Sequence, residues 1–112
     1  MGPYPFKGEV IWLTAEQGGR RSGIPPISAD WSYAHVAHVP PHSAETGSAS
    51  FVLRGWDPER WRSPAEGKWL IVSNENDQLV EAGSVIVVAE GKRTSAIFLV
   101  HRVEDLSEEP PE

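Results

Sequence analysis

Short apolar runs separated by Gly, Pro, Ser and Asn dominate the pattern of hydrophobic and polar positions along this chain of 112 residues. Such runs are typical of strands, and no segment shows the three- and four-residue spacing of a convincing amphipathic helix. The pattern predicts five or six strands, at Phe6–Thr14, Trp31–Val39, Ser50–Trp56, Lys68–Ser73, Ser84–Ala89 and Thr94–Val103. Strands at these intervals without helices between them predict an all-β fold, a small barrel or a sandwich.

The clearest local signal is at the end of the chain, where Ser84–Ala89 and Thr94–Val103 are joined by the tight segment Glu90–Arg93. This arrangement predicts a hairpin. By contrast, residues 57–67 are rich in proline and charge, and we expect them to form a connection. The apolar positions of the first and last runs predict that six residues are mostly withdrawn from solvent: Val10, Trp12, Ile86, Val88, Ile97 and Leu99.

The length allows one domain, at residues 1–103, because a chain of this size can bury a single core without cross-links. Five of the 16 acidic residues follow Val103 with no basic residue among them, so the net charge of −6 leaves a body near −1. We expect residues 104–112 to be an acidic disordered tail, which either solubilises the chain or attracts a basic partner.

The chemistry-bearing residues give little support for catalysis. There is no cysteine, no phosphate-binding or dinucleotide-binding motif and no nucleophile in a recognised catalytic motif, so we expect no enzyme, no cofactor and no bound nucleotide. His35, His38 and His42 suggest a metal site. However, strand geometry points the first two to opposite faces, and Pro40 and Pro41 separate the third, so we predict no metal there. No run is long enough to span a membrane and no signal-peptide pattern is present, so we expect a soluble cytoplasmic protein.

Tryptophan is frequent, with five residues in the chain. Three of them lie in predicted strands and are expected in the core: Trp12, Trp31 and Trp69. The other two bracket a charged connection. Because Trp and Arg dominate the energetics of interfaces, this connection is a candidate protein-interaction loop, made of Trp56, Arg60, Trp61 and Arg62. The alternative is that both of its indoles fold back as lids over an open end of the barrel.

Basic residues gather near two predicted turns, the one after the first strand and the one in the terminal hairpin. They are Arg20, Arg21, Lys92 and Arg93. If both turns meet at one end of the barrel, four cations would face one partner, for which the phosphate backbone of RNA is a candidate. The alternative is that they are ordinary solvated side chains. The acidic charge of the whole chain opposes non-specific attraction of RNA.

Two segments resemble the C-terminal β-barrel domain of elongation factor Tu. Phe6–Leu13, followed by Glu16-Gln-Gly-Gly-Arg20, is similar to that domain's opening strand and its Glu-Gly-Gly-Arg turn. Residues 79–94 are similar to its closing hairpin, with agreeing spacing. The resemblance covers about 40 residues at the two ends of the chain. It implies a stand-alone six-stranded antiparallel Greek-key barrel.

In that family the two turns help to hold the T-stem backbone of aminoacyl-tRNA. By position, the implied contacts fall on Arg20, Glu90 and Gly91. With the neighbouring bases, the candidate RNA or phosphate contacts are Arg20, Arg21, Glu90, Gly91, Lys92 and Arg93. The sequence departs from the family in lacking the GTPase domain and the second barrel, in placing Lys92 where a glycine is expected, and in the connection from Trp56 to Arg62.

These observations favour a non-catalytic, translation-factor-like barrel that binds a protein partner. The partner would be a translation component or an effector that normally targets elongation factor Tu. The alternative function is weak contact with tRNA or another RNA through the basic turns.

Overall fold

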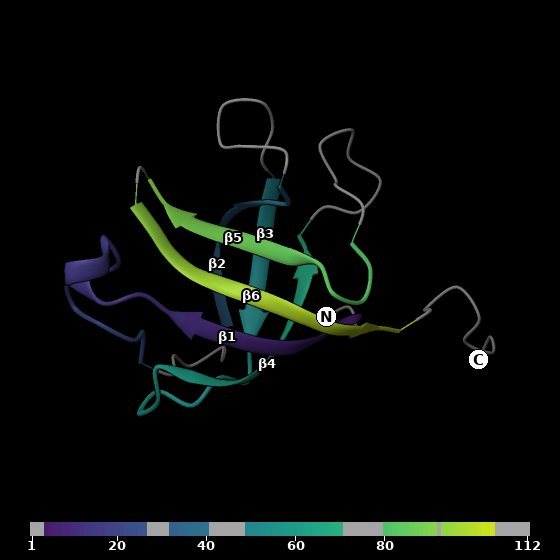
Figure 1. Ribbon diagram of the computed structural model, residues 1–112, viewed down its shortest axis with the longest axis horizontal. Coiled ribbons are helices and arrows are strands. Elements are labelled where there is room, and N and C mark those ends of the chain that lie inside the picture. Colours follow the sequence, from purple (N-terminus) through teal and green to yellow (C-terminus); the bar gives the residue numbers. More distant parts are fainter. Residues whose placement is uncertain (1–3, 27–31, 41–48, 71–79, 92, 105–112) are drawn as a thin grey trace.

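The computed structural model describes residues 4–26, 32–40, 49–70, 80–91 and 93–104. These residues form a closed barrel of six antiparallel strands (Figure 1): β1 Phe6–Trp12, β2 Ser32–His38, β3 Ala49–Arg54, β4 Arg62–Trp69, β5 Val85–Glu90 and β6 Arg93–Val103. The predicted six-stranded antiparallel barrel is therefore confirmed. Residues Trp31, His42, Lys92 and 105–112 lie outside the described ranges.

The order of the strands around the barrel is β1-β4-β3-β2-β5-β6, with β6 paired to β1. Three consecutive strands, β2, β3 and β4, are neighbours, and β5 returns to lie beside β2. This order is that of a Greek key. β1 closes the barrel between β4 and β6, and closure protects the backbone groups that an open sheet exposes at its edges.

The main difference from the predicted elements is in the fourth strand. β4 occupies Arg62–Trp69, whereas the sequence pattern predicted a connection through residue 67 and a strand from Lys68 to Ser73. The misleading residue is Pro64, which cannot donate a backbone hydrogen bond and is rare inside sheets. Here it pairs only with Glu9 of β1, because the pairing of β4 with β3 begins at Glu66. A proline is tolerated where a strand has a neighbour on one side only.

The terminal hairpin is confirmed, with β5 and β6 pairing from Val85–Leu99 to Glu90–Arg93. All six residues predicted to be mostly withdrawn from solvent are at least partly buried. Four of them are at most 2% exposed: Val10, Trp12, Ile86 and Val88. Ile97 and Leu99 are partly buried and lie outside the core cluster. In β6 the inward residues are Ala96, Phe98 and Val100. The apolar run in β6 covers both faces of the strand, so alternation alone could not choose between them.

The interior contains two groups of packed aromatic side chains. Towards one end, Phe51 packs against Phe6, Trp69 and Phe98, with ring centroids 5.0–6.1 Å apart. Gly67 makes this packing possible, because a Cβ there would lie 2.5 Å from the Phe51 ring. Towards the other end, three more aromatic side chains meet at nearly right angles: Trp12, Tyr33 and Trp56. The predicted core positions of Trp12 and Trp69 are confirmed.

The end of the barrel beside Trp12, Tyr33 and Trp56 is called the barrel end below. Three connections meet there: the first turn, which follows β1 and contains a short 3-10 helix at Ala15–Gln17, the β5–β6 turn, and the loop between β3 and β4 (Figure 1). A capping box fixes the first turn, since the Thr14 hydroxyl accepts from the Gln17 backbone and the Gln17 side chain accepts from the Thr14 backbone. The predicted site residues all belong to these three connections or to their borders.

Candidate functional site

The two turns that carry the predicted RNA contacts do come together at the barrel end. Arg20 of the first turn donates from Nε to Oε2 of Glu90, at 2.8 Å, and also donates to the carbonyl oxygen of Gly23. Arg93 of the hairpin donates to the carbonyl oxygen of Gly19, at 3.5 Å. The convergence therefore rests on direct hydrogen bonds between the turns.

These contacts leave the basic residues in unequal positions. The Arg20 side chain is 19% exposed, and its charge is balanced by Glu90. Arg21 and Arg93 are exposed, and Gly91 at the tip of the hairpin is exposed with a φ of 61°. Lys92 lies outside the described residues. Of the described cations here, Arg21 and Arg93 are thus the ones whose charge is open to solvent.

The Glu90 carboxylate is the centre of a polar network that the sequence pattern did not indicate. The Tyr33 hydroxyl donates to Glu90, and the Ser95 hydroxyl lies 2.8 Å from the Tyr33 oxygen. His35 Nε2 lies 3.8 Å from the same carboxylate. Burial and the hydrogen bond to Glu90 raise the pKa of Tyr33 well above its usual range. Tyr33 therefore stays a neutral donor, and the network ties β2 to the terminal hairpin.

The same network carries the residue types of a proton-transfer chain, but its serine faces inward. Ser95 is fully buried, and its hydroxyl donates to the carbonyl oxygen of Val88 at 3.3 Å. A nucleophile has to meet its substrate, so this serine is a structural member of the barrel.

In the candidate protein-interaction loop, Trp56 belongs to the interior. It is 3% exposed, its indole Nε1 donates to the carbonyl oxygen of Pro25 at 2.9 Å, and its ring packs against Trp12 at 5.6 Å. This hydrogen bond satisfies the buried indole N–H and joins the loop to the chain beyond the first turn. Trp56 therefore covers the barrel end, which agrees with the alternative that its indole folds back as a lid.

Trp61 lies five positions further along and is 46% exposed. Its backbone is fixed, because its carbonyl oxygen accepts from the backbone N–H of Trp12 at 2.7 Å. The loop itself is held by Asp57, whose backbone N–H donates to the Ser63 hydroxyl oxygen at 2.9 Å and whose carbonyl oxygen accepts from the backbone N–H of Arg60 at 3.2 Å. The exposed indole is therefore presented by an ordered backbone.

The other two members of the loop differ in their surroundings. Arg60 is exposed beside Trp61. Arg62 is the first residue of β4, and its guanidinium makes a bidentate contact with the Glu9 carboxylate. Nη2 donates to Oε1 at 2.6 Å and Nε donates to Oε2 at 3.2 Å. The structure thus leaves the neighbouring residues Arg60 and Trp61 exposed at the surface, and places Trp56 in the core and Arg62 on the outer wall of the barrel.

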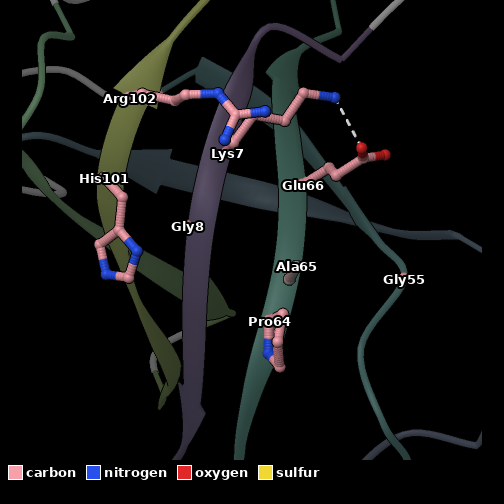
Figure 2. A pocket seen from close by; sticks show the side chains of 8 residues that line it. All are labelled: Lys7, Gly8, Gly55, Pro64, Ala65, Glu66, His101 and Arg102. Carbon is pink, nitrogen blue, oxygen red and sulfur yellow. Dashed lines mark hydrogen bonds and ion pairs between the residues drawn. The ribbon is translucent and has the colours of Figure 1, made fainter.

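That outer wall contains a groove over β1, between β4 and β6 (Figure 2). Its volume is about 460 Å³, and small residues form part of its lining: Gly8, Gly55 and Ala65. Gly8 lies at a bulge in the β1–β6 pairing, where a Cβ would lie 1.8 Å from the Leu99 carbonyl oxygen. Only glycine fits this close approach, so no side chain rises from β1 at that point.

Charged side chains border the groove. Lys7 Nζ lies 2.6 Å from Oε2 of Glu66, as the dashed line in Figure 2 shows, and Arg54 Nε lies 2.8 Å from Oε1. The hydrogen bonds from Lys7 and Arg54 hold the pKa of Glu66 below its usual range. The hydrogen bond from Arg62 likewise lowers the pKa of Glu9. Both carboxylates are therefore ionised at neutral pH.

Two of the three histidines predicted not to form a metal site lie within the described residues. His35 and His38 lie on β2, and His42 is outside the described residues. Among the described residues, no group of three or more His, Cys, Asp or Glu could hold a metal ion. No helix within the described ranges is long and apolar enough to cross a membrane.

Comparison with protein-family models, with curated proteins and with solved structures gives no match for this chain.

Proposed function

We propose that this protein is a non-catalytic binding module whose barrel presents Trp61 and Arg60 to a protein partner. The observation that carries the proposal is the 46% exposure of Trp61 on a loop whose backbone is anchored to Trp12. A half-exposed indole keeps a large apolar area in water, and burying such an anchor against a partner is typically worth about 2 kcal/mol or more.

The order of the loop adds to this argument. Binding costs conformational entropy for each side chain and loop that must be fixed, and a loop that is already fixed avoids part of that cost. Trp56 is buried beneath the loop, and Asp57 holds the turn that leads to Arg60. The neighbouring guanidinium of Arg60 offers directional donors at the edge of the apolar surface, where a carbonyl or carboxylate of a partner could accept them.

We further propose that the protein is a free-standing relative of the elongation factor Tu barrel that has acquired a new partner. The loop from Trp56 to Arg62 is where the sequence departs from that family, and loops change at little cost to a barrel. The partner would then be a translation component or an effector that normally targets the elongation factor.

A second candidate function is RNA contact at the converged turns. It is supported by the hydrogen bonds that join the first turn to the hairpin and by the exposed positions of Arg21 and Arg93. It is weakened by Glu90, which balances the charge of Arg20. If RNA is bound there, low-salt binding should fall steeply as salt rises, and Arg21→Glu with Arg93→Glu should abolish it.

The test of the first candidate is recovery of a partner from native lysate with the tagged full chain. Trp61→Ala should reduce recovery at least about tenfold, corresponding to loss of one anchor, while the melting temperature stays within a few degrees of wild type. Leu70→Ala is the matched control, because Leu70 is also exposed, at 51%, and follows the last residue of β4, whereas Trp61 precedes the first.

Three outcomes separate the possibilities. Loss with Trp61→Ala alone supports the proposal, and a Trp61→Phe variant should restore part of the recovery. Equal loss with both alanine variants would indicate a non-specific apolar effect. Undiminished recovery with Trp61→Ala would place the partner elsewhere on the barrel and refute the proposed role of the loop.

A further inference from the structure

The outer-wall groove is bordered by more cations than carboxylates, although the chain as a whole has a net charge of −6. Three carboxylates lie there with four cations, Lys7, Arg54, Arg62 and Arg102, of which Lys7 is shared by two carboxylates. Glu66 contacts Lys7 and Arg54, and Glu9 contacts Arg62 and His101. Glu104 lies 3.2 Å from Arg102 and 3.9 Å from Lys7. The groove is thus a locally basic surface on an acidic protein.

The three arginines also stand further into solvent than the carboxylates that they contact, whereas the Lys7 side chain is only 20% exposed. The arginine side chains are 41% exposed at Arg54, 60% at Arg62 and 68% at Arg102. The carboxylates they contact are 33% exposed at Glu66, 25% at Glu9 and 44% at Glu104. A group that approaches the wall therefore meets guanidinium edges before it meets the carboxylates beneath them.

The arginines keep hydrogen-bonding capacity for such a group. A guanidinium carries five N–H donors in a fixed plane. In the described part of the chain, Arg54 donates to Glu66 from Nε, and Arg102 donates to Glu104 from one terminal nitrogen. The Arg54 and Arg102 side chains are 41% and 68% exposed, so an incoming acceptor can reach them and compete with the carboxylates already in contact.

The basic side chains surround a hollow in which an extended segment of another protein could lie. The Lys7 and Arg102 side chains lie across one end of the hollow, and Gly8 leaves its middle open between His101 and Pro64 (Figure 2). An extended chain laid along β1 would have its side chains alternate towards and away from this floor. Acidic side chains on one face of such a segment would reach the cations on both borders.

We infer that the outer-wall groove binds carboxylate side chains of an acidic protein segment, with Arg102 as a principal contact. The chain already supplies an example of the interaction, because Glu104 places a carboxylate against Arg102 at the border of the groove. This inference does not rest on the role proposed for Trp61. Its experiment uses a peptide directly and can fail or succeed whatever the outcome for the loop.

An acidic protein segment fits this surface better than a nucleic acid does. A phosphate backbone carries closely and regularly spaced negative charges and binds best to an uninterrupted basic track. Here Glu9, Glu66 and Glu104 interrupt the track and would repel phosphates. A peptide in which acidic and neutral residues alternate carries its carboxylates on one face of the extended chain, so they can point towards the arginines while the neutral residues point away from the wall.

The experiment measures binding of the full chain to a fluorescently labelled heptapeptide that alternates glutamate and glycine. The first comparison peptide has glutamine in place of glutamate, and the second probe is a labelled single-stranded oligothymidylate. We expect the glutamate peptide to bind and the glutamine peptide to bind at least about tenfold more weakly. Raising salt from about 0.05 to about 0.3 M should weaken the glutamate complex severalfold.

Two variants with opposite expected effects on peptide binding make the test specific. Arg102→Glu should weaken peptide binding about tenfold, because it replaces an attraction with a repulsion. Glu104→Gln should strengthen binding about threefold, because it removes the carboxylate that already occupies Arg102. Arg21→Glu is the matched control, since it reverses an exposed arginine at the barrel end and should change peptide binding less than twofold.

Binding of the glutamate peptide with these opposite effects supports the inference. Equal binding of the two peptides, an equal loss in Arg102→Glu and Arg21→Glu, or no binding at low salt would overturn it. Tighter binding of the oligothymidylate that is also lost in Arg102→Glu would show that the groove selects phosphate, and would overturn it as well. Circular dichroism of each variant verifies that the barrel is intact.

Discussion

The barrel end and the outer-wall groove contain the same kind of contact in different surroundings. Arg20 and Glu90 are 2.8 Å apart, and Arg62 and Glu9 are 2.6 Å apart. The side chains of the first pair are 19% and 27% exposed, whereas Arg62 of the second pair is 60% exposed. Short distance therefore says little about the role of an ion pair. The more buried pair, Arg20 and Glu90, joins two elements of the fold. In the more exposed pair, Arg62 and Glu9, solvent screens the attraction and a partner can replace it.

The same contrast divides the two tryptophans of the β3–β4 loop. Trp56 is buried, with its N–H satisfied by Pro25, and Trp61 keeps nearly half of its surface in water. The two indoles are five positions apart in the sequence, yet one belongs to the core and the other to the surface. The residue type alone did not distinguish them, because both stand in the same charged connection.

The largest effect expected from this comparison is on stability at Trp56. Replacing a buried aromatic residue by alanine leaves a cavity and typically costs about 3–5 kcal/mol. Trp56→Ala should therefore lower the free energy of unfolding by that amount in urea titrations. Trp61→Ala should lower it by less than about 1 kcal/mol, because its indole is half in solvent in the folded state. Similar losses in the two variants would contradict the division of the loop into a buried and an exposed half.

Much of the fold could be predicted because the first and last runs are strongly patterned. The sequence around Val10 and that of the terminal hairpin identified strands that the structure confirms. The fourth strand was missed because Pro64 and its charged neighbours are typical of loops. Their position beside β1 depends on the way the whole barrel closes, which no local pattern reveals.

The candidate sites were only partly predictable, for a related reason. The sequence pattern predicted a shared phosphate surface only on the condition that the two turns converge, and the contact that neutralises Arg20 at Glu90 depends on side-chain direction. The network through Tyr33 and Ser95 joins residues 62 positions apart and left no local signal. The groove was missed because its floor is made of small residues, which carry no chemistry of their own to attract attention.

A smaller effect is expected in the network at the barrel end. Tyr33→Phe removes the hydroxyl that donates to Glu90 and leaves Ser95 with one partner fewer, so it should cost about 1–2 kcal/mol. A double-mutant cycle with Glu90→Gln measures the coupling, for which contacting residues typically give about 0.5 kcal/mol or more. The corresponding cycle on the outer wall, with Arg62→Gln and Glu9→Gln, should show a smaller coupling, because the Arg62 side chain is 60% exposed. Equal coupling in the two cycles would mean that burial does not separate the two regions.

The smallest effect concerns pH and the outer wall. Hydrogen bonds from Lys7 and Arg54 lower the pKa of Glu66 from its ordinary value of 4.5. A carboxyl whose pKa is lower in the folded state stabilises the fold above its unfolded pKa, and this contribution is lost as pH falls through the folded value. Glu66→Gln should therefore be less stable than wild type at pH 7, and the difference should vanish at acidic pH. Since Glu66 is one third exposed, we expect the difference at pH 7 to be at most about 1 kcal/mol.

The measurement is the difference in free energy of unfolding between wild type and Glu66→Gln, followed from about pH 7 to about pH 3. Glu59→Gln is the control, because it removes an exposed carboxylate on the β3–β4 loop, away from Lys7 and Arg54. A difference that persists unchanged to acid pH would mean that Glu66 acts through packing and not through its charge. A difference well above 1 kcal/mol would mean that the outer wall is held by its ion pairs as firmly as the barrel end. Its cations could then not be released to a carboxylate partner without loss of the fold.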